Sequence, residues 1–191
     1  NIYWIYSNYR AFDIIRDLIE KRKNDPIDEL ILIHLAKNTN SDVLDLLRRF
    51  NPRDFIDEIW DELCYNPNPK AFDMIMENIN YIESLDRNNE ILFYLNLCRN
   101  HKAIEFLIKN KDLINWISLS ENPYAIDLLL KNPDKIYYPS LCSNNHPEAV
   151  KIILRILKQE GFNSKKIDYL KLFSNESPDI VQFLNINFDK Y

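Results

Sequence analysis

The fold is decided by a stretch that reads Trp116-Ile117-Ser118-Leu119-Ser120-Glu121-Asn122-Pro123-Tyr124-Ala125-Ile126-Asp127-Leu128-Leu129. A short apolar segment ends at Leu119-Ser120, an Asn-Pro turn follows, and Ala125 opens a second apolar segment. Asn is favoured just before a helix, where its side chain accepts from an unpaired backbone N–H, and Pro is favoured at the first helical position. The stretch therefore predicts a helix, a tight turn and a second helix.

The same pattern recurs seven times along the chain. Each second helix contains an anchor residue (Ala, Val or Ile), followed by apolar residues one, three and four positions later, which is the period of a helix with one buried face. The anchors are 32, 28, 32, 22, 24 and 31 residues apart, and they are Ala11, Val43, Ala71, Ala103, Ala125, Ala149 and Ile180. A capping residue precedes each anchor by three positions: Asn8, Asn40, Asn68, Asn100, Asn122, His146 and Ser177.

A shorter apolar segment lies upstream of each turn and is predicted to be the first helix of a pair. It ends in a large apolar residue plus, in most copies, a small residue: Leu35-Ala36, Leu63-Cys64, Leu97-Cys98, Leu119-Ser120, Leu141-Cys142 and Phe173-Ser174. One turn earlier, on the same face, stand Leu32, Trp60, Tyr94, Trp116, Tyr138 and Leu170. We expect both positions to be buried.

Helical repeats of this size predict an all-α fold, an α-solenoid or superhelix of about seven helix-turn-helix repeats. Residues 1–191 would form a single repeat domain, or part of a longer array. Gly161 is the only glycine, which excludes Gly-rich phosphate loops and dinucleotide fingerprints. We therefore expect Asn78, Asn110 and Asn132 to take the positive-φ positions at helix ends, because Asn tolerates them next best.

The net charge and the length of the apolar runs limit which classes of partner the chain could have. A net charge of −5 disfavours nucleic acid as a general partner, because nucleic-acid binders carry a basic surface. The longest apolar run, Leu30 to Leu35, is too short to span a bilayer, and no secretory signal is visible. We predict an intracellular protein that does not insert into membranes.

The cysteines and histidines predict no metal, cofactor or redox site. Cys64, Cys98 and Cys142 all occupy the small-residue position of a first helix, so we interpret them as buried spacers. His34, His101 and His146 stand in different repeats without a second histidine at ligand spacing. No catalytic residue is predicted, and we expect no enzyme.

Two acidic features are candidates for recognition. The first is a cluster of carboxylates that we interpret as a solvated helix face, with a paired acid/base site as the alternative: Asp54, Asp57, Glu58, Asp61 and Glu62. The second is an acidic ladder two positions after the anchors, which would keep the chain in solution or meet a basic partner: Asp13, Asp45, Asp73, Glu105 and Asp127.

Segments of this chain resemble two known kinds of helical repeat. Leu32-Ile33-His34-Leu35-Ala36-Lys37-Asn38, with Val43-Leu44-Asp45-Leu46-Leu47, resembles the two helices of an ankyrin repeat, although the Thr-Pro opening and the steady period are missing. The stretch from 116 to 129, with Asn132-Pro133-Asp134-Lys135-Ile136, is similar to the Asn-Pro helical repeats of giant DNA viruses. The resemblance implies an ankyrin-like helical stack without clear β-hairpin fingers, an interaction role and a location in a host cell or virion.

The function that these patterns favour is a non-enzymatic interaction or scaffold module that binds another protein. The predicted binding face is the residue before the terminal Leu of each first helix: His34, Glu62, Asn96, Ser118 and Ser140. One alternative is a structural subunit of a larger, viral assembly with end-to-end contacts, for which Tyr3, Trp4, Phe188 and Tyr191 are candidates. A second alternative is a helical repeat that binds single-stranded RNA.

Overall fold

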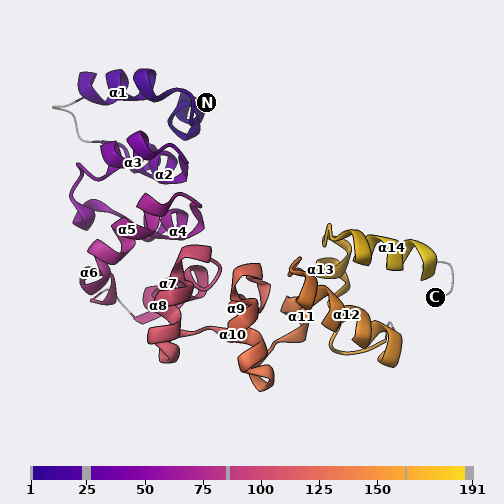
Figure 1. The fold of residues 1–191 in the computed structure, drawn as a ribbon. Helices are drawn as coiled ribbons and strands as arrows, with labels where there is room; N and C mark the ends of the chain where they lie inside the picture. The colour runs from indigo at the N-terminus through magenta and orange to yellow at the C-terminus, as the bar shows by residue number, and fades with distance from the viewer. Residues whose placement is uncertain (1, 23–26, 85–86, 162, 188–191) are drawn as a thin grey trace. The chain divides into compact units, whose positions relative to one another are not determined.

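All regular secondary structure is helical in the part of the chain that the structure describes, a computed structural model covering residues 2–22, 27–84, 87–161 and 163–187 (Figure 1). The all-α prediction is confirmed. The chain divides into two compact units, residues 1–103 and residues 104–191. Phe188 and Tyr191, named above as end-contact candidates, lie outside the described residues.

Unit 1 is built from helix pairs. Its elements are η1 (Ile2–Ser7), α1 (Phe12–Lys21), α2 (Glu29–Lys37), α3 (Ser41–Leu47), η2 (Pro52–Asp54), α4 (Asp57–Tyr65), α5 (Pro69–Glu77), α6 (Ile79–Glu83), α7 (Arg87–Leu97) and η3 (His101–Ala103), where η marks a 3-10 helix. First helices contact first helices, with η1, α2, α4 and α7 in succession, and second helices α1, α3 and α5 do the same (Figure 1). Neighbouring repeats in the sequence are therefore neighbours in space.

Unit 2 continues the same pairing with shorter elements. They are α8 (Ile104–Lys109), η4 (Lys111–Leu113), α9 (Trp116–Glu121), η5 (Pro123–Ala125), α10 (Ile126–Lys131), η6 (Pro133–Lys135), α11 (Tyr138–Leu141), α12 (Pro147–Glu160), α13 (Tyr169–Phe173) and α14 (Pro178–Asn187). First helices α9 and α11 contact each other, as do second helices α12 and α14.

The predicted apolar columns form the core. All seven anchors are buried, with an exposed fraction of 7% at Ala11 and 0% at the other six. Ile14 and Val181, predicted to be buried, are 55% and 44% exposed. They belong to the first and seventh repeats.

The predicted helix caps are confirmed at five of the seven positions, and at Asn8 the same bond forms in the turn before α1, whose N-cap is Ala11. The side chains of Asn8, Asn40, Asn68, Asn100 and Asn122 accept from the backbone N–H two residues later, and His146 does the same through Nδ1 at 3.2 Å. Pro69, Pro147 and Pro178 begin their α-helices and Pro123 begins η5, where a missing N–H costs nothing.

A second set of asparagines, not predicted from the sequence, joins consecutive repeats. We call them the linking asparagines: Asn38, Asn66, Asn100, Asn144 and Asn175. Each is buried, and its Nδ2 donates to the carbonyl oxygen that closes the first helix of the preceding repeat. The bonds run to Tyr6 O, Ala36 O, Cys64 O, Ser120 O and Cys142 O at 2.6–3.0 Å. Apart from Tyr6, these acceptors are the predicted small-residue positions.

The two turn lengths differ in how they use asparagine. In the longer turns the linking asparagine and the cap are separate residues, and the linking Oδ1 accepts from the backbone N–H of the cap, as Asn144 does from His146 at 3.0 Å. In the shorter turn, Asn100 does both tasks, because its Oδ1 caps at Lys102 while its Nδ2 reaches Cys64 O.

The prediction of positive φ at Asn78, Asn110 and Asn132 is wrong. Their φ angles are −113°, −125° and −134°, and among the described residues only Gly161 has a positive φ. Instead, each Nδ2 donates at 2.8–2.9 Å to the carbonyl oxygen four residues earlier. The side-chain amide thus satisfies an open helix-end carbonyl without a left-handed turn.

The predicted register of the last first helix is also wrong, by one residue. Leu172 is fully buried, whereas Phe173 is 54% and Leu170 is 85% exposed. The turn geometry decides the register, because Asn175 links back to Cys142 O and therefore puts Phe173 in the small-residue position. Tyr169 then takes the place predicted for Leu170.

Replacing Asn66 by Ala tests the linking role. Asn66 donates to Ala36 O and Asn38 O, and accepts from the Asn68 N–H. The change leaves buried backbone groups unpaired, so we expect a loss of about 2–4 kcal/mol in the free energy of unfolding, measured by urea titration and circular dichroism.

The matched control is Asn51→Ala. Asn51 caps η2 through the Arg53 N–H and is exposed, so its loss should cost only about 0.5–1 kcal/mol. Equal costs for the two variants would contradict the linking role.

Candidate functional site

The predicted binding face is not an open surface. Among its five residues, Asn96, Ser118 and Ser140 are only 7%, 1% and 0% exposed, and His34 and Glu62 are half-buried. The prediction of exposed contact residues is therefore wrong for Asn96, Ser118 and Ser140. The physical reason is the packing of first helix on first helix, which places this position between consecutive repeats.

In this buried position four of the five residues contact neighbouring first helices, whereas Ser118 Oγ is buried without a partner in the described residues. His34 Nδ1 lies 2.7 Å from Ser7 Oγ, and Glu62 forms an ion pair with Lys37 at 3.1 Å. Asn96 on α7 accepts from the Tyr65 hydroxyl at 2.7 Å and donates to Asp61 Oδ1 at 2.6 Å. These contacts hold α4 against α7 and fix the Asp61 carboxylate.

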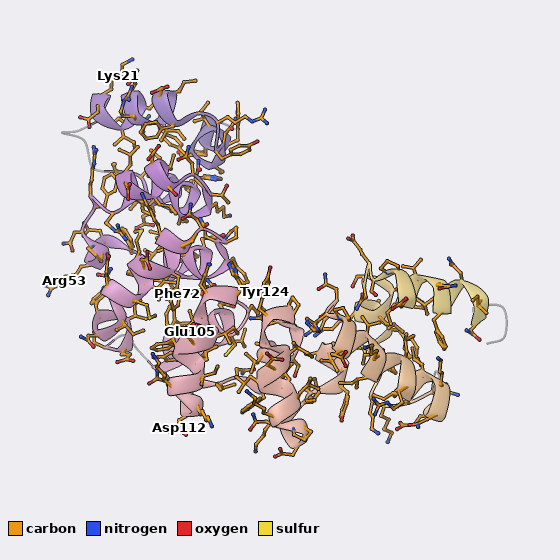
Figure 2. The ribbon with its side chains drawn as sticks, viewed as in Figure 1. Lys21, Arg53, Phe72, Glu105, Asp112 and Tyr124 are labelled. Atoms are coloured by element: carbon orange, nitrogen blue, oxygen red, sulfur yellow. The ribbon has the colours of Figure 1, made fainter. Side chains whose placement is uncertain are left out.

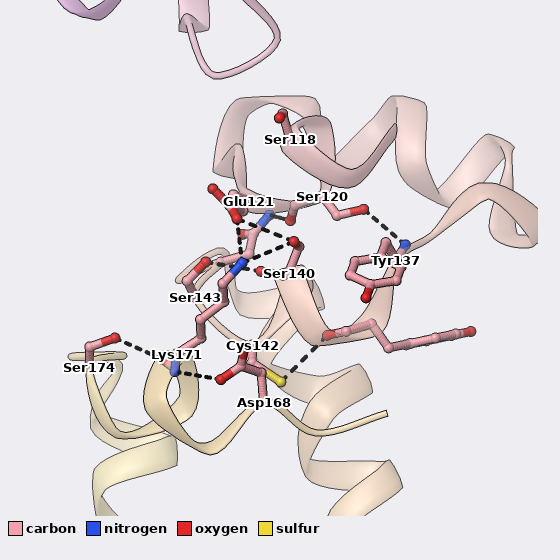
Figure 3. A network of polar contacts seen from close by, with 12 residues as sticks. Ser118, Ser120, Glu121, Tyr137, Ser140, Cys142, Ser143, Asp168, Lys171 and Ser174 are labelled. Atoms are coloured by element: carbon pink, nitrogen blue, oxygen red, sulfur yellow. Dashed lines mark hydrogen bonds and ion pairs between the residues drawn. The ribbon is translucent and has the colours of Figure 1, made fainter. Parts of the chain in front are cut away.

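In unit 2 the equivalent contacts form the network in Figure 3. Lys171 Nζ donates to both Glu121 Oε1 and Ser140 Oγ, and Ser140 Oγ donates to the same carboxylate at 3.2 Å. Although serine and lysine are adjacent, Ser140 has no exposed surface and Lys171 is neutralised by Glu121. The arrangement fits a structural link between α11 and α13 and offers no open nucleophile.

The acidic ladder is exposed at all five positions, and Glu105 is labelled in Figure 2. Two members are neutralised in part, since Asp13 pairs with Arg16 at 3.1 Å and Asp45 pairs with Lys70. Asp73, Glu105 and Asp127 form no ion pair in the described part of the chain. The three unpaired members serve below as a control surface.

The feature that best fits a binding site is a cavity of about 220 Å³ in unit 1, which we call the α4 cavity. Its wall combines carboxylates with aromatic and aliphatic side chains from α4, α6 and α7. The lining residues are Asp57, Glu58, Trp60, Asp61, Ile82, Leu92 and Phe93. Three members of the acidic cluster, interpreted from sequence as a plain solvated face, therefore lie at a hollow.

The three carboxylates have no ion pair in the described part of the chain. Asp57, Glu58 and Asp61 differ in this from Asp45, Glu62 and Glu121, each of which pairs with a lysine. Asp57 and Glu58 stand in the first turn of α4, where the helix dipole favours negative charge. Asp61 lies further along the helix and lacks that stabilisation.

Burial raises the pKa of the Asp61 carboxyl above its ordinary value; the Asn96 hydrogen bond opposes this shift, and the nearby carboxylates Asp57, Glu58 and Glu62 add to it. The ionised form of Asp61 is thus disfavoured in the folded chain.

Trp60 lines the same cavity and has a hydrogen-bond donor without an acceptor among the described residues. The residue is 2% exposed, and its Nε1–H is buried without an acceptor in the described structure.

A second cavity in unit 1, near α1, α2 and η2, is larger, at about 960 Å³. Arg22, Arg49 and Arg53 line it together with Glu20, Glu29 and Asp54, and Arg49 pairs with Glu20 at 3.2 Å. Arg53 extends away from the ribbon (Figure 2). Since its charges balance, this cavity has no charge preference, and we regard the smaller α4 cavity as the better candidate.

The described residues contain no cluster that could bind a metal ion. No group of three His, Cys, Asp or Glu side chains there could hold a metal ion. Cys64, Cys98 and Cys142 are buried and not in disulfides, as their small-residue position predicts, and burial raises the pKa of Cys64 and Cys142. No helix in the described ranges combines the length and apolar character needed to cross a membrane.

Thiol labelling tests the interpretation of the cysteines. Because all three thiols are buried, and burial raises the pKa of Cys64 and Cys142, we expect an aromatic disulfide reagent to modify the three cysteines only after unfolding in denaturant. Rapid release of the coloured thiol from the native chain would contradict this.

Substitution of Asp61 by Asn tests the strain at the α4 cavity. A raised pKa in the folded chain means that the native fold is least favoured where Asp61 is ionised, at neutral pH. We expect Asp61→Asn to raise the melting temperature at pH 7, with the difference from wild type shrinking as the pH falls through the raised pKa. A lower melting temperature for the variant at pH 7 would show that the ionised carboxylate stabilises the fold.

Comparison with known proteins adds no identification. No protein-family model matches the chain, and no curated protein or solved structure matches it significantly.

Proposed function

We propose that this chain is a non-enzymatic α-solenoid that binds another protein through the α4 side of unit 1. The pairing of each repeat with its sequence neighbours supports the solenoid, because repeats that contact only their neighbours are the defining feature of that class. The buried polar links between first helices favour a rigid scaffold.

One observation carries the binding role. Three carboxylates without basic partners surround a hollow with aromatic walls, in a chain that pairs Glu62, Asp45 and Glu121 with lysines. An uncompensated charge of this kind costs self-repulsion in the free protein and is complementary to a basic surface. A basic segment of a partner protein is therefore the ligand class that the α4 cavity favours.

The same carboxylates disfavour single-stranded RNA, since they repel phosphates, and Trp60 and Tyr94 are buried where RNA would need exposed rings for stacking.

A role as a structural subunit is favoured by one feature of unit 2. Leu170 and Phe173 on α13 are 85% and 54% exposed. That role requires the isolated chain to self-associate, which sedimentation measures directly.

The proposal is tested by a triple variant, Asp57→Asn, Glu58→Gln and Asp61→Asn. We expect the wild-type chain to capture a specific protein from an extract of its native cells, and the triple variant to lose that protein because the uncompensated charge is gone. Co-purifying proteins are identified by mass spectrometry after treatment with ribonuclease.

The control is the triple variant Asp73→Asn, Glu105→Gln and Asp127→Asn, which removes the same charge from exposed positions away from the α4 cavity. It should retain the captured protein. Capture that depends on RNA, or that both triple variants lose equally, would count against a binding site at α4.

A further inference from the structure

We propose that the α4 cavity binds the side chain of a single arginine in an extended basic segment of the partner. This inference rests on the proposed protein-binding function and names the group that the site recognises. It draws on the size, charge and walls of the cavity, each of which is independent of the others.

The size fits one long side chain. A volume of about 220 Å³ corresponds to roughly seven water molecules at their share of liquid volume. Pockets for cofactors and drug-sized ligands occupy ~300–1,000 Å³, so this one is below that range. One residue of a partner segment fits it better than a cofactor does.

The charge selects a cation. Asp57 and Asp61 are four residues apart and share one face of α4, with Glu58 adjoining them. A guanidinium presents five N–H donors in one plane and can bridge several carboxylate oxygens. A cation beside Asp61 also offsets the burial that raises its pKa, because an opposite charge favours the ionised carboxyl.

The chemistry of the guanidinium favours arginine over lysine. It is planar and weakly hydrated and can pair with two carboxylates at once, whereas an ammonium keeps its water more strongly. Of the apolar lining residues, Leu92 is 53% exposed at the rim and can cover the methylene stem, whereas Trp60, Ile82 and Phe93 are 2%, 1% and 4% exposed and form the base of the cavity.

Trp60 lines the cavity and carries an unmet donor. Its Nε1 and Ser118 Oγ are the two buried side-chain polar atoms that lack a partner in the described residues, and only Trp60 lines the α4 cavity. Because an indole N–H can only donate, its resonance is a sensitive reporter of occupation of the cavity.

The experiment follows the three tryptophan indole N–H resonances of the isotope-labelled chain during titration with the peptide acetyl-Gly-Arg-Gly-amide. Single variants Trp4→Phe and Trp116→Phe assign the signals. We expect a saturable shift of the Trp60 signal alone. The matched peptide with citrulline keeps the shape and removes the charge, so its affinity should be lower by a factor of about ten or more. The affinity of the lysine peptide should lie between those of the arginine and citrulline peptides.

Two variants decide the outcome. The shift should vanish with Asp57→Asn, Glu58→Gln and Asp61→Asn, and persist with Asp73→Asn, Glu105→Gln and Asp127→Asn. Equal binding of the citrulline or lysine peptide, or equal loss in both triple variants, overturns the arginine site. If the cell extract still yields a partner that depends on the α4 carboxylates, the proposed function stands and only the arginine assignment falls.

Discussion

The structure depends on the carbonyl oxygens at the ends of its first helices. A helix leaves its last carbonyl groups without partners, and here these ends are covered by the next repeat, so water cannot satisfy them. The linking asparagines resolve this, because one amide donates to the preceding repeat while its oxygen accepts from its own turn. A small residue at the accepting position lets the amide approach the backbone closely. Ala36, Cys64, Ser120 and Cys142 are therefore small for one shared reason, and the cysteines need no redox explanation.

Much of this arrangement could be predicted from the sequence, since helix period, caps and prolines depend on local chemistry. The anchors and five caps follow that logic, and the structure agrees with it. The errors arise where the answer is not local. Asn78 has the residue type of a left-handed helix end, yet its side chain bonds to Met74 O and makes that backbone conformation unnecessary. Phe173 matches the terminal apolar residue by type, but the link from Asn175 to Cys142 O sets the register one residue earlier.

The candidate site was harder to predict for the same reason. Hydrophobic period identifies which side of a first helix faces its own partner helix, and says nothing about which polar positions face the next repeat. Asn96 therefore reads as exposed from sequence, although it is buried between α4 and α7 and holds Asp61. The acidic cluster was visible, but its distinction from an ordinary solvated face depends on Ile82 and Phe93, which come from later helices. No spacing rule within α4 carries that information.

The two turn lengths have a consequence for how such an array changes. The linking asparagine is placed by its distance from the end of the first helix, whereas the cap is placed by its distance from the anchor of the second. Asn100 satisfies both distances at once, and Asn144 with His146 satisfies them separately, two residues apart. Insertion or deletion of two residues between these points leaves the contacts of both helices intact. The turn can therefore differ in length between repeats, and the distance between anchors along the sequence does not measure the distance between neighbouring helices.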